Sequence, residues 1–272
     1  MDLVSAQSEL SGHAGGSPAV GLVISIVIAV GAWRRGSLAA SGATAAVVVG
    51  TIIYAAGGAG WFAVLGVFFV TSTLLGRVGK ARKAAVKREF DKGDTRDAWQ
   101  VLANGGAATL AALAMAGSPS WRWADAFVAG LAAANADTWA TELGVLSRGE
   151  PWSLVRFCRV PRGTSGAVSP LGLGAAFAGA LAVGLTAALS SSRPWHTIAV
   201  ALGFGVAGAL ADSLLGATLQ ERWHCASCGR DSESARHHCG NDGVRSGGLV
   251  GFGNDAVNAA STFAAALAAA LF

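Results

Sequence analysis

Apolar stretches close to the ~20 residues that a helix needs to cross a bilayer recur along this chain. Eight can be delimited, at about 20–33, 38–56, 61–75, 98–116, 123–146, 171–189, 197–219 and 248–272. The first three are short or weakly separated, so seven is the alternative count. Only 13% of the residues are charged and 53% are hydrophobic, which excludes both a soluble domain and a disordered chain. The sequence predicts an all-α, polytopic membrane protein with about eight transmembrane helices.

Small residues dominate these stretches, and they allow helix backbones to approach closely in lipid. We therefore expect one tight bundle, with residues 1–19 as an extramembrane tail and 20–272 as a single transmembrane catalytic domain. Its loops are expected at about 77–97, 147–170 and 220–247. No cleavable signal peptide is expected, because the N-terminus has no Lys or Arg before Arg34.

Basic residues alternate between the loops and predict the orientation. Of the 20 Lys and Arg residues, all but Arg122 and Arg193 lie in the loops after the first, third, fifth and seventh stretches. Positive loops stay in the cytoplasm during insertion. We therefore expect these loops in the cytoplasm, both termini outside, and a multi-pass location in the cell membrane.

One glycine pattern resembles a nucleotide-binding motif by chance. Residues 203–208 read Gly-Phe-Gly-Val-Ala-Gly, which matches the dinucleotide fingerprint. That motif needs a preceding strand, whereas this segment lies within an expected spanning helix. Close helix packing is the better interpretation.

Acidic residues inside the expected spans carry the strongest functional signal. Asp137, Glu142, Asp212 and Asp255 fall there without a Lys or Arg beside them in the spans, although an ionised side chain at mid-membrane costs about 2.5–3.5 kcal/mol. The expected helix directions put Asp137 and Asp212 at similar depth in the cytoplasmic half. Asp125, at the outer edge, is interpreted as interfacial.

Amides, hydroxyls and one further carboxyl group, that of Asp97, follow the same helix faces at helical spacing. These residues are Asp97, Gln100, Asn104, Thr138, Thr141, Asn254 and Asn258. Oxygen ligands without basic partners favour a hard cation, so we expect one cytoplasmic site with Mg²⁺ on Asp137, Asp212 and Asp255. The alternative is that these groups only form hydrogen bonds between helices.

A glycine-rich segment adjoins the expected site. Arg162, Gly163, Thr164, Ser165 and Gly166 precede the sixth span in a basic loop. Free backbone N–H groups at a helix N-terminus bind anions, so Thr164 or Ser165 is expected to cap that helix or bind phosphate. A plain loop with a cap is the alternative. Arg96, which ends the basic run from Arg77, is expected to face a nucleotide.

The loop after the seventh span contains three of the four cysteines. Cys225 and Cys228 form a C-x₂-C pair, and Cys239 follows directly after His238. This pattern suits a small Cys₃His zinc site formed by these four residues. The alternative is a reduced polar loop without metal.

Taken together, these motifs resemble those of the membrane phytyl-phosphate kinase family. That family includes transmembrane protein 19 and was long catalogued as a domain of unknown function. The resembling segments are 100–106, 136–144, 162–169, 211–217, the C-x₂-C-Gly loop and 254–258, in the same order. The resemblance covers roughly residue 20 to the C-terminus, and it adds Ser169 to the expected phosphate-binding residues.

The resemblance implies a nucleotide-dependent kinase, often CTP-using, that converts an isoprenyl monophosphate of the phytyl type into the diphosphate with Mg²⁺. Asp137, Asp212, Asp255 and Glu142 are then the expected catalytic residues. The expected partners are CTP or another nucleoside triphosphate, an isoprenyl monophosphate and membrane lipids, but no nucleic acid. A lipid-phosphate cytidylyltransferase and a small-solute or ion transporter stay open as alternatives.

Overall fold

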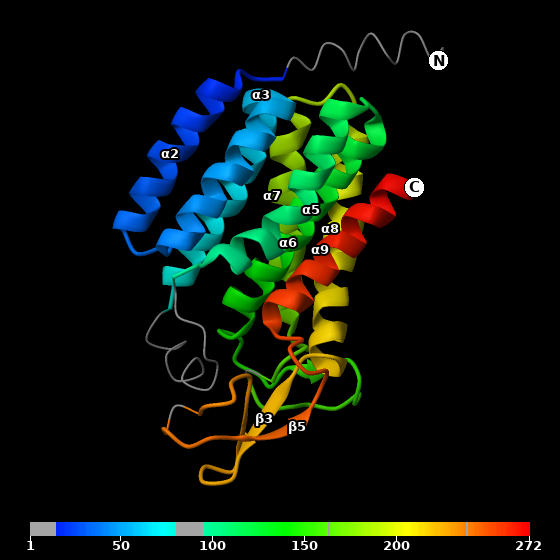
Figure 1. Ribbon diagram of the computed structural model, residues 1–272. Helices are drawn as coiled ribbons and strands as arrows, with labels where there is room; N and C mark the ends of the chain where they lie inside the picture. Colours follow the sequence, from blue (N-terminus) through cyan, green and yellow to red (C-terminus); the bar gives the residue numbers. More distant parts are fainter. Residues whose placement is uncertain (1–14, 80–94, 163, 238) are drawn as a thin grey trace.

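The structure is a computed structural model that describes residues 15–79, 95–162, 164–237 and 239–272. In these ranges the chain forms seven helices joined by loops that contain five short strands (Figure 1). The helices are α2 (Pro18–Arg34), α3 (Ala40–Arg77), α5 (Ala98–Gly117), α6 (Trp121–Gly144), α7 (Pro170–Ala188), α8 (Pro194–Thr218) and α9 (Asn254–Leu271). The predicted helical membrane bundle is confirmed.

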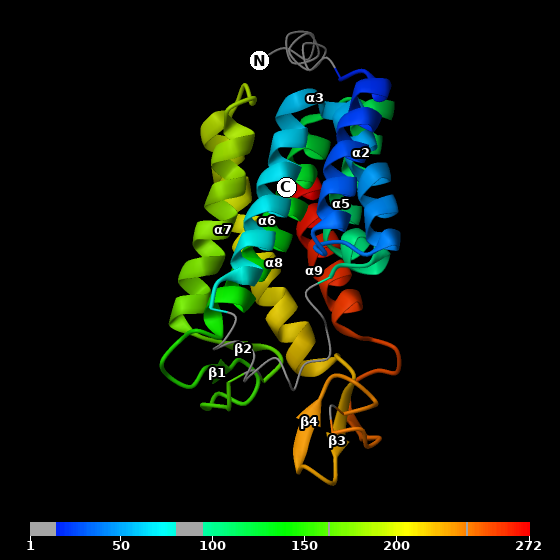
Figure 2. The same cartoon turned by 90° about the vertical axis from the view of Figure 1, so that its left-hand side faces the viewer.

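Helix α3 folds back on itself at Gly58 (Figures 1 and 2). Gly58 has φ 63° and ψ −156°, a conformation that is essentially restricted to glycine. The two ends of α3 consequently lie together, and Nη2 of Arg77 donates a hydrogen bond to Oγ of Ser37 at 3.3 Å. The predicted spans 38–56 and 61–75 are thus two arms of one helix, which accounts for seven helices where eight apolar segments were expected.

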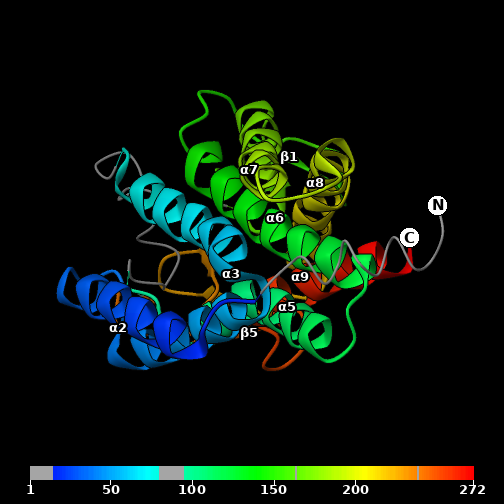
Figure 3. The same ribbon diagram turned by 90° about the horizontal axis from the view of Figure 1, so that it is seen from above.

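Within the described ranges, three helices, α3, α7 and α8, are long and apolar enough to cross a membrane, and α2 is apolar but shorter. Helix α6 lies at the centre of the bundle, with α7 and α8 on one side and α5 and α9 on the other (Figure 3). It is buried without interruption from residue 126 to residue 136. A helix enclosed in this way can carry polar groups without exposing them to lipid.

Small residues let α8 pack directly against α6. A Cβ added at Gly205 would lie 2.8 Å from Cβ of Ala132, and one added at Gly208 would lie 2.5 Å from Cβ of Ala133. Both glycines belong to the segment 203–208, which is helical throughout. The packing interpretation of this glycine pattern is therefore confirmed.

Most of the described basic residues lie at one end of the bundle, and the described chain begins at the other end (Figures 1 and 2). We call the first of these the basic-loop end. Here β1 (Trp152–Ser153) pairs with β2 (Ala167–Val168) in an antiparallel ribbon. Strands β3 (Arg222–Cys225), β4 (Arg230–Ser232) and β5 (Val244–Gly247) form an antiparallel sheet in the order β4-β3-β5. Neither small sheet was predicted.

Candidate functional site

A cavity of about 460 Å³ lies at the basic-loop end, between helices and loops that are far apart in the sequence. The second arm of α3 and helices α5, α6, α7, α8 and α9 contribute to its walls, together with the loops that follow α2, α6 and α8. Its volume is in the range of pockets that bind small molecules.

Two carboxyl groups meet in the wall of this cavity. The carboxyl groups of Asp137 on α6 and Asp212 on α8 lie close enough to interact directly. Each lies about two turns, or roughly 9–11 Å, before the end of its helix at the basic-loop end. The two helices run in the same direction and pack closely, so residues at equal depth become neighbours. Oγ of Ser261 on α9 also donates a hydrogen bond to Oδ2 of Asp212 at 2.9 Å.

The first turns of α9 bring further oxygen atoms to the cavity. Asn254, Asp255 and Asn258 all line it. Asn258 is half-buried, and its Oδ1 atom has no hydrogen-bond partner among the described residues. A buried amide oxygen of this kind is costly unless a ligand or water satisfies it. It is therefore an observation, separate from the carboxylates, that points to a ligand in this cavity.

The residues of the expected polar stripe on α5 have different roles: one caps the helix, and two line the cavity. Asp97 caps the helix by accepting a hydrogen bond from the backbone N–H of Gln100 at 2.9 Å, and it does not line the cavity. Gln100 and Asn104 do line it. The amide of Asn104 donates to the carbonyl of Gln100 at 2.9 Å, which leaves its side-chain oxygen for other partners.

Arginines from the loops and from the end of α3 line the cavity beside the acids. They are Arg35, Arg77, Arg96 and Arg162. Burial lowers the pKa of Arg96, while the nearby Glu142 carboxylate acts in the opposite direction. Residues 95–97 are held against the start of α3, because Ala39 N–H donates to the carbonyl of Arg96 at 2.9 Å. The intramembrane acids thus have basic neighbours that the expected spans did not reveal.

The glycine-rich segment packs against α8 instead of starting the next helix. Helix α7 begins at Pro170 and is capped by Ser169, whose Oγ accepts a hydrogen bond from Gly172 N–H at 3.0 Å. The expectation that Thr164 or Ser165 caps this helix is therefore wrong, because β2 and Ser169 intervene. Gly166 has φ 71°, and a Cβ there would lie 2.1 Å from the carbonyl oxygen of Ser213.

The cavity gathers the predicted site residues from all these elements. Its lining includes Arg96, Asn104, Asp137, Thr138, Glu142, Arg162, Thr164, Ser165, Gly166, Ser169, Asp212, Asn254, Asp255 and Asn258. Gly163 and His238 lie outside the described residues. The catalytic and binding roles of these residues stay predictions.

Several polar residues of the cavity were not predicted, among them Gln220, Ser72 and Glu233. Gln220 is buried; its Oε1 accepts a hydrogen bond from Ser165 Oγ at 2.8 Å, while its Nε2 has no partner in the described part of the chain. Ser72 is also buried, and its Oγ has no partner among those residues. The loop of residues 221–253, between α8 and α9, contains three cysteines and is called the cysteine loop. Its Glu233 lies near Asp212 and lines the cavity. A polar residue beside a loop or near a helix end gives no sequence signal that separates it from surface residues.

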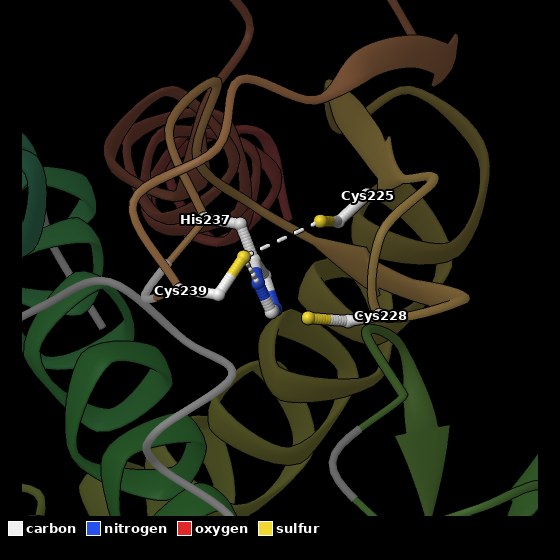
Figure 4. Close-up of side chains that lie close together, drawn as sticks. All are labelled: Cys225, Cys228, His237 and Cys239. Carbon is white, nitrogen blue, oxygen red and sulfur yellow. Dashed lines mark hydrogen bonds between the residues drawn. The ribbon is translucent and has the colours of Figure 1, made fainter.

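Three cysteines and a histidine of the cysteine loop form a separate cluster, and none of these four residues lines the cavity. Cys225, Cys228, His237 and Cys239 each offer a donor atom, and these atoms all lie within 4.8 Å of one another (Figure 4). His237 supplies the histidine of this cluster, whereas the predicted His238 lies outside the described residues. The hydrogen bond with His237 lowers the pKa of Cys239 to about 6, whereas the hydrogen bond with Cys239 raises the pKa of Cys228 to about 11.

The fold and the cavity define the chain as an integral membrane helical-bundle protein with a charged site at one end. A profile of the integral membrane protein family DUF92 matches residues 23–266, and the chain belongs to this family. The family membership expected from the sequence motifs is thus confirmed.

Relatives come from a plant, an archaeon and a cyanobacterium. Protein PGR of Arabidopsis thaliana is 35% identical over 230 residues, which cover 75% of this chain and 80% of the relative. An uncharacterized membrane protein of Methanocaldococcus jannaschii is 36% identical over 57% of this chain and 63% of its own length. Another of Synechocystis sp. is 34% identical over 65% of this chain and 69% of its own length. No solved structure matches the chain.

Proposed function

We propose that this protein is a membrane kinase that transfers a phosphoryl group from a nucleoside triphosphate, CTP first among them, to an isoprenyl monophosphate. The observation that carries this proposal is the meeting of Asp137 and Asp212 in a cavity that four arginines and a glycine-rich segment also line. Phosphoryl transfer depends mainly on positioning and on charge neutralisation, and this set of groups supplies both.

The oxygen donors fit Mg²⁺. Asp137 and Asp212 would hold it with Asp255, and the unpartnered Oδ1 of Asn258 is a further neutral donor in the same cavity. All of these are hard oxygen ligands, which Mg²⁺ prefers over nitrogen or sulfur. Bound there, Mg²⁺ would neutralise charge on the nucleotide phosphates. Glu142, which lies near Arg96, would orient the guanidinium group of Arg96.

The basic and amide groups fit the anionic substrates. Arg96 and Arg162 would bind phosphate oxygens, because guanidinium groups match them with two parallel hydrogen bonds. Thr164, Ser165 and Gly166 would contribute hydroxyl or backbone donors beside them, and the unpartnered Nε2 of Gln220 is one more buried donor. The acceptor is itself a phosphate that is ionised at neutral pH, so the reaction needs no strong general base.

The apolar part of the cavity fits a lipid acceptor. Leu173, Ala176 and Leu210 line it on α7 and α8, within the apolar bundle. An isoprenyl tail would lie along these helices while its phosphate meets the carboxylates and arginines. The basic-loop end would face the cytoplasm, where soluble nucleotides are available.

The test is a substrate screen with the full chain purified in detergent. Phytyl, geranylgeranyl and farnesyl monophosphates are each combined with labelled CTP, ATP, GTP or UTP and Mg²⁺. Formation of an isoprenyl diphosphate together with CDP, or the matching nucleoside diphosphate, is the expected result. Release of pyrophosphate would instead identify a cytidylyltransferase. Absence of turnover with every pair would contradict the proposal.

A further inference from the structure

We propose that Cys225, Cys228, His237 and Cys239 form a structural zinc site that holds the cysteine loop against the rim of the cavity. The sequence pattern left this open and pointed to a different histidine. The site lies outside the cavity, so the proposal does not depend on the proposed kinase function.

The distances suit a metal ion better than a disulfide. Sγ of Cys225 and Sγ of Cys239 are 3.6 Å apart, and all three cysteines of the cluster are free thiols. Two sulfurs on one tetrahedral zinc lie roughly 3.8 Å apart, given a Zn–S distance of about 2.3 Å, whereas a disulfide needs about 2.05 Å. Nδ1 of His237 lies 3.1 Å from Sγ of Cys239, so the imidazole completes the group of four donors (Figure 4).

A tight backbone turn that ends on a glycine holds each pair of ligands, Cys225 with Cys228 and His237 with Cys239. At the end of β3, Gly229 N–H donates to the carbonyl of Cys225 at 2.8 Å, and Gly229 has φ 64°. In the second turn, Gly240 N–H donates to the carbonyl of His237 at 2.9 Å, and Gly240 has φ 87°. Each turn closes on a left-handed glycine that directly follows a cysteine. The two turns face each other and direct their four donors to one point.

The loop has almost no other core. Among its described residues from 221 to 253, only Cys225, Ser232 and His237 are buried. Three strands of three or four residues with no apolar core are not stable by themselves. A metal bound to four side chains supplies the missing stabilisation, as in other small zinc domains. Three thiolates with one imidazole favour zinc and leave no open coordination position, which indicates a structural ion.

The same loop is fixed to the cavity through its base. Glu221 N–H donates to the carbonyl of Phe252, and Leu249 N–H donates to the carbonyl of Leu219, both at 2.9 Å. These bonds close the loop next to Gln220, whose side chain contacts Ser165. Zinc would therefore keep Gln220 and Glu233 at the cavity.

The experiment measures zinc in the full chain purified in detergent without chelators. We expect about one zinc per chain by mass spectrometry of metals, with most of it lost in Cys225→Ser and in His237→Gln. His238→Gln and Cys158→Ser are the matched controls and should keep it. Less than about a tenth of a zinc per chain in folded wild-type protein would overturn the proposal, as would loss in His238→Gln with retention in His237→Gln.

Cobalt exchange provides a second readout that does not require the variants to fold. Co²⁺ in the wild-type protein should give the intense visible bands and the thiolate charge-transfer bands of a tetrahedral sulfur-rich site. A weak octahedral spectrum, or a Cys225–Cys239 disulfide found in protein kept under reducing conditions, would contradict the proposal. Neither measurement uses kinase turnover, so failure of one proposal can be told from failure of the other.

Discussion

Asp137 and Asp212 bring two carboxyl groups together inside the bundle, and ionising both is unfavourable unless a cation lies close to them. We expect Asp137→Asn and Asp212→Asn to leave folding intact, because each removes a charge with little change in volume. Mg²⁺-dependent phosphoryl transfer should fall on the order of 10²-fold or more, since electrostatic stabilisation dominates such reactions. The measurement is isoprenyl-phosphate kinase activity across Mg²⁺ concentrations.

Asp125→Asn is the matched control, because Asp125 lies on the same helix but at the opposite end. It pairs there with Arg193 at 3.2 Å and with His196 at 2.9 Å. Its loss should change the melting temperature at most and should leave kinase activity near normal. Near-normal activity in both Asp137→Asn and Asp212→Asn would rule out the metal-site interpretation and favour the transporter alternative.

Gly166 provides a test of the glycine-rich segment. An alanine there meets the carbonyl of Ser213 and must hold φ near 71°, which costs about 1–2 kcal/mol for a residue with a Cβ. Gly166→Ala should displace the segment and lower turnover by roughly 10–100-fold, because small misplacements are costly in catalysis. In Gly174→Ala the new Cβ meets no atom within 4 Å, so this control should behave as wild type. Equal activity in the two variants would show that the segment does not position substrate.

At the scale of elements, the contact between α6 and α8 brings the two aspartates together. Gly208→Ala would place a Cβ 2.5 Å from that of Ala133, and overpacking of this kind costs about 1–3 kcal/mol. We expect a lower melting temperature in detergent and reduced activity, because the helices must separate. Gly203→Ala lies in the same glycine pattern but faces open space, and it should be neutral. If both variants melt alike, the close packing does not contribute to stability.

Elements also differ in how well the sequence predicted them. Apolar length and small-residue content predicted the spans, and the capping box of Asp97 and Gln100 begins α5 as these residue types favour. Hydropathy shows the fold-back at Gly58 only as a gap between two spans, because a positive φ at a glycine leaves no mark in a hydropathy pattern. The short strands of the cysteine loop were missed, since they lack the alternation of polar and apolar residues that marks a strand.

At the scale of the whole molecule, orientation is the property that determines which substrates reach the cavity. Basic loops remain in the cytoplasm during insertion, so the basic-loop end should be cytoplasmic and the other end external. Alkaline phosphatase fused after Phe272 should therefore be active in a bacterial host, and the same enzyme fused after Ser147 should be inactive. A fluorescent protein at the same two positions should give the opposite pattern. Reversal of both results would place the cavity on the external side, where cytosolic nucleotides cannot reach it, and would contradict the predicted orientation.

The sequence by itself determined the membrane bundle, the clustering of basic residues in alternate loops, and the common depth of Asp137 and Asp212. These follow from hydropathy, charge and helical rise, which are local properties that can be counted along the chain. The tertiary structure alone decided that Gln220 contacts Ser165, that Arg35 and Arg77 share the cavity with the acids, and that His237 joins the cysteines. These are contacts between distant segments, and they depend on how helices pack and where loops close, which no local pattern specifies.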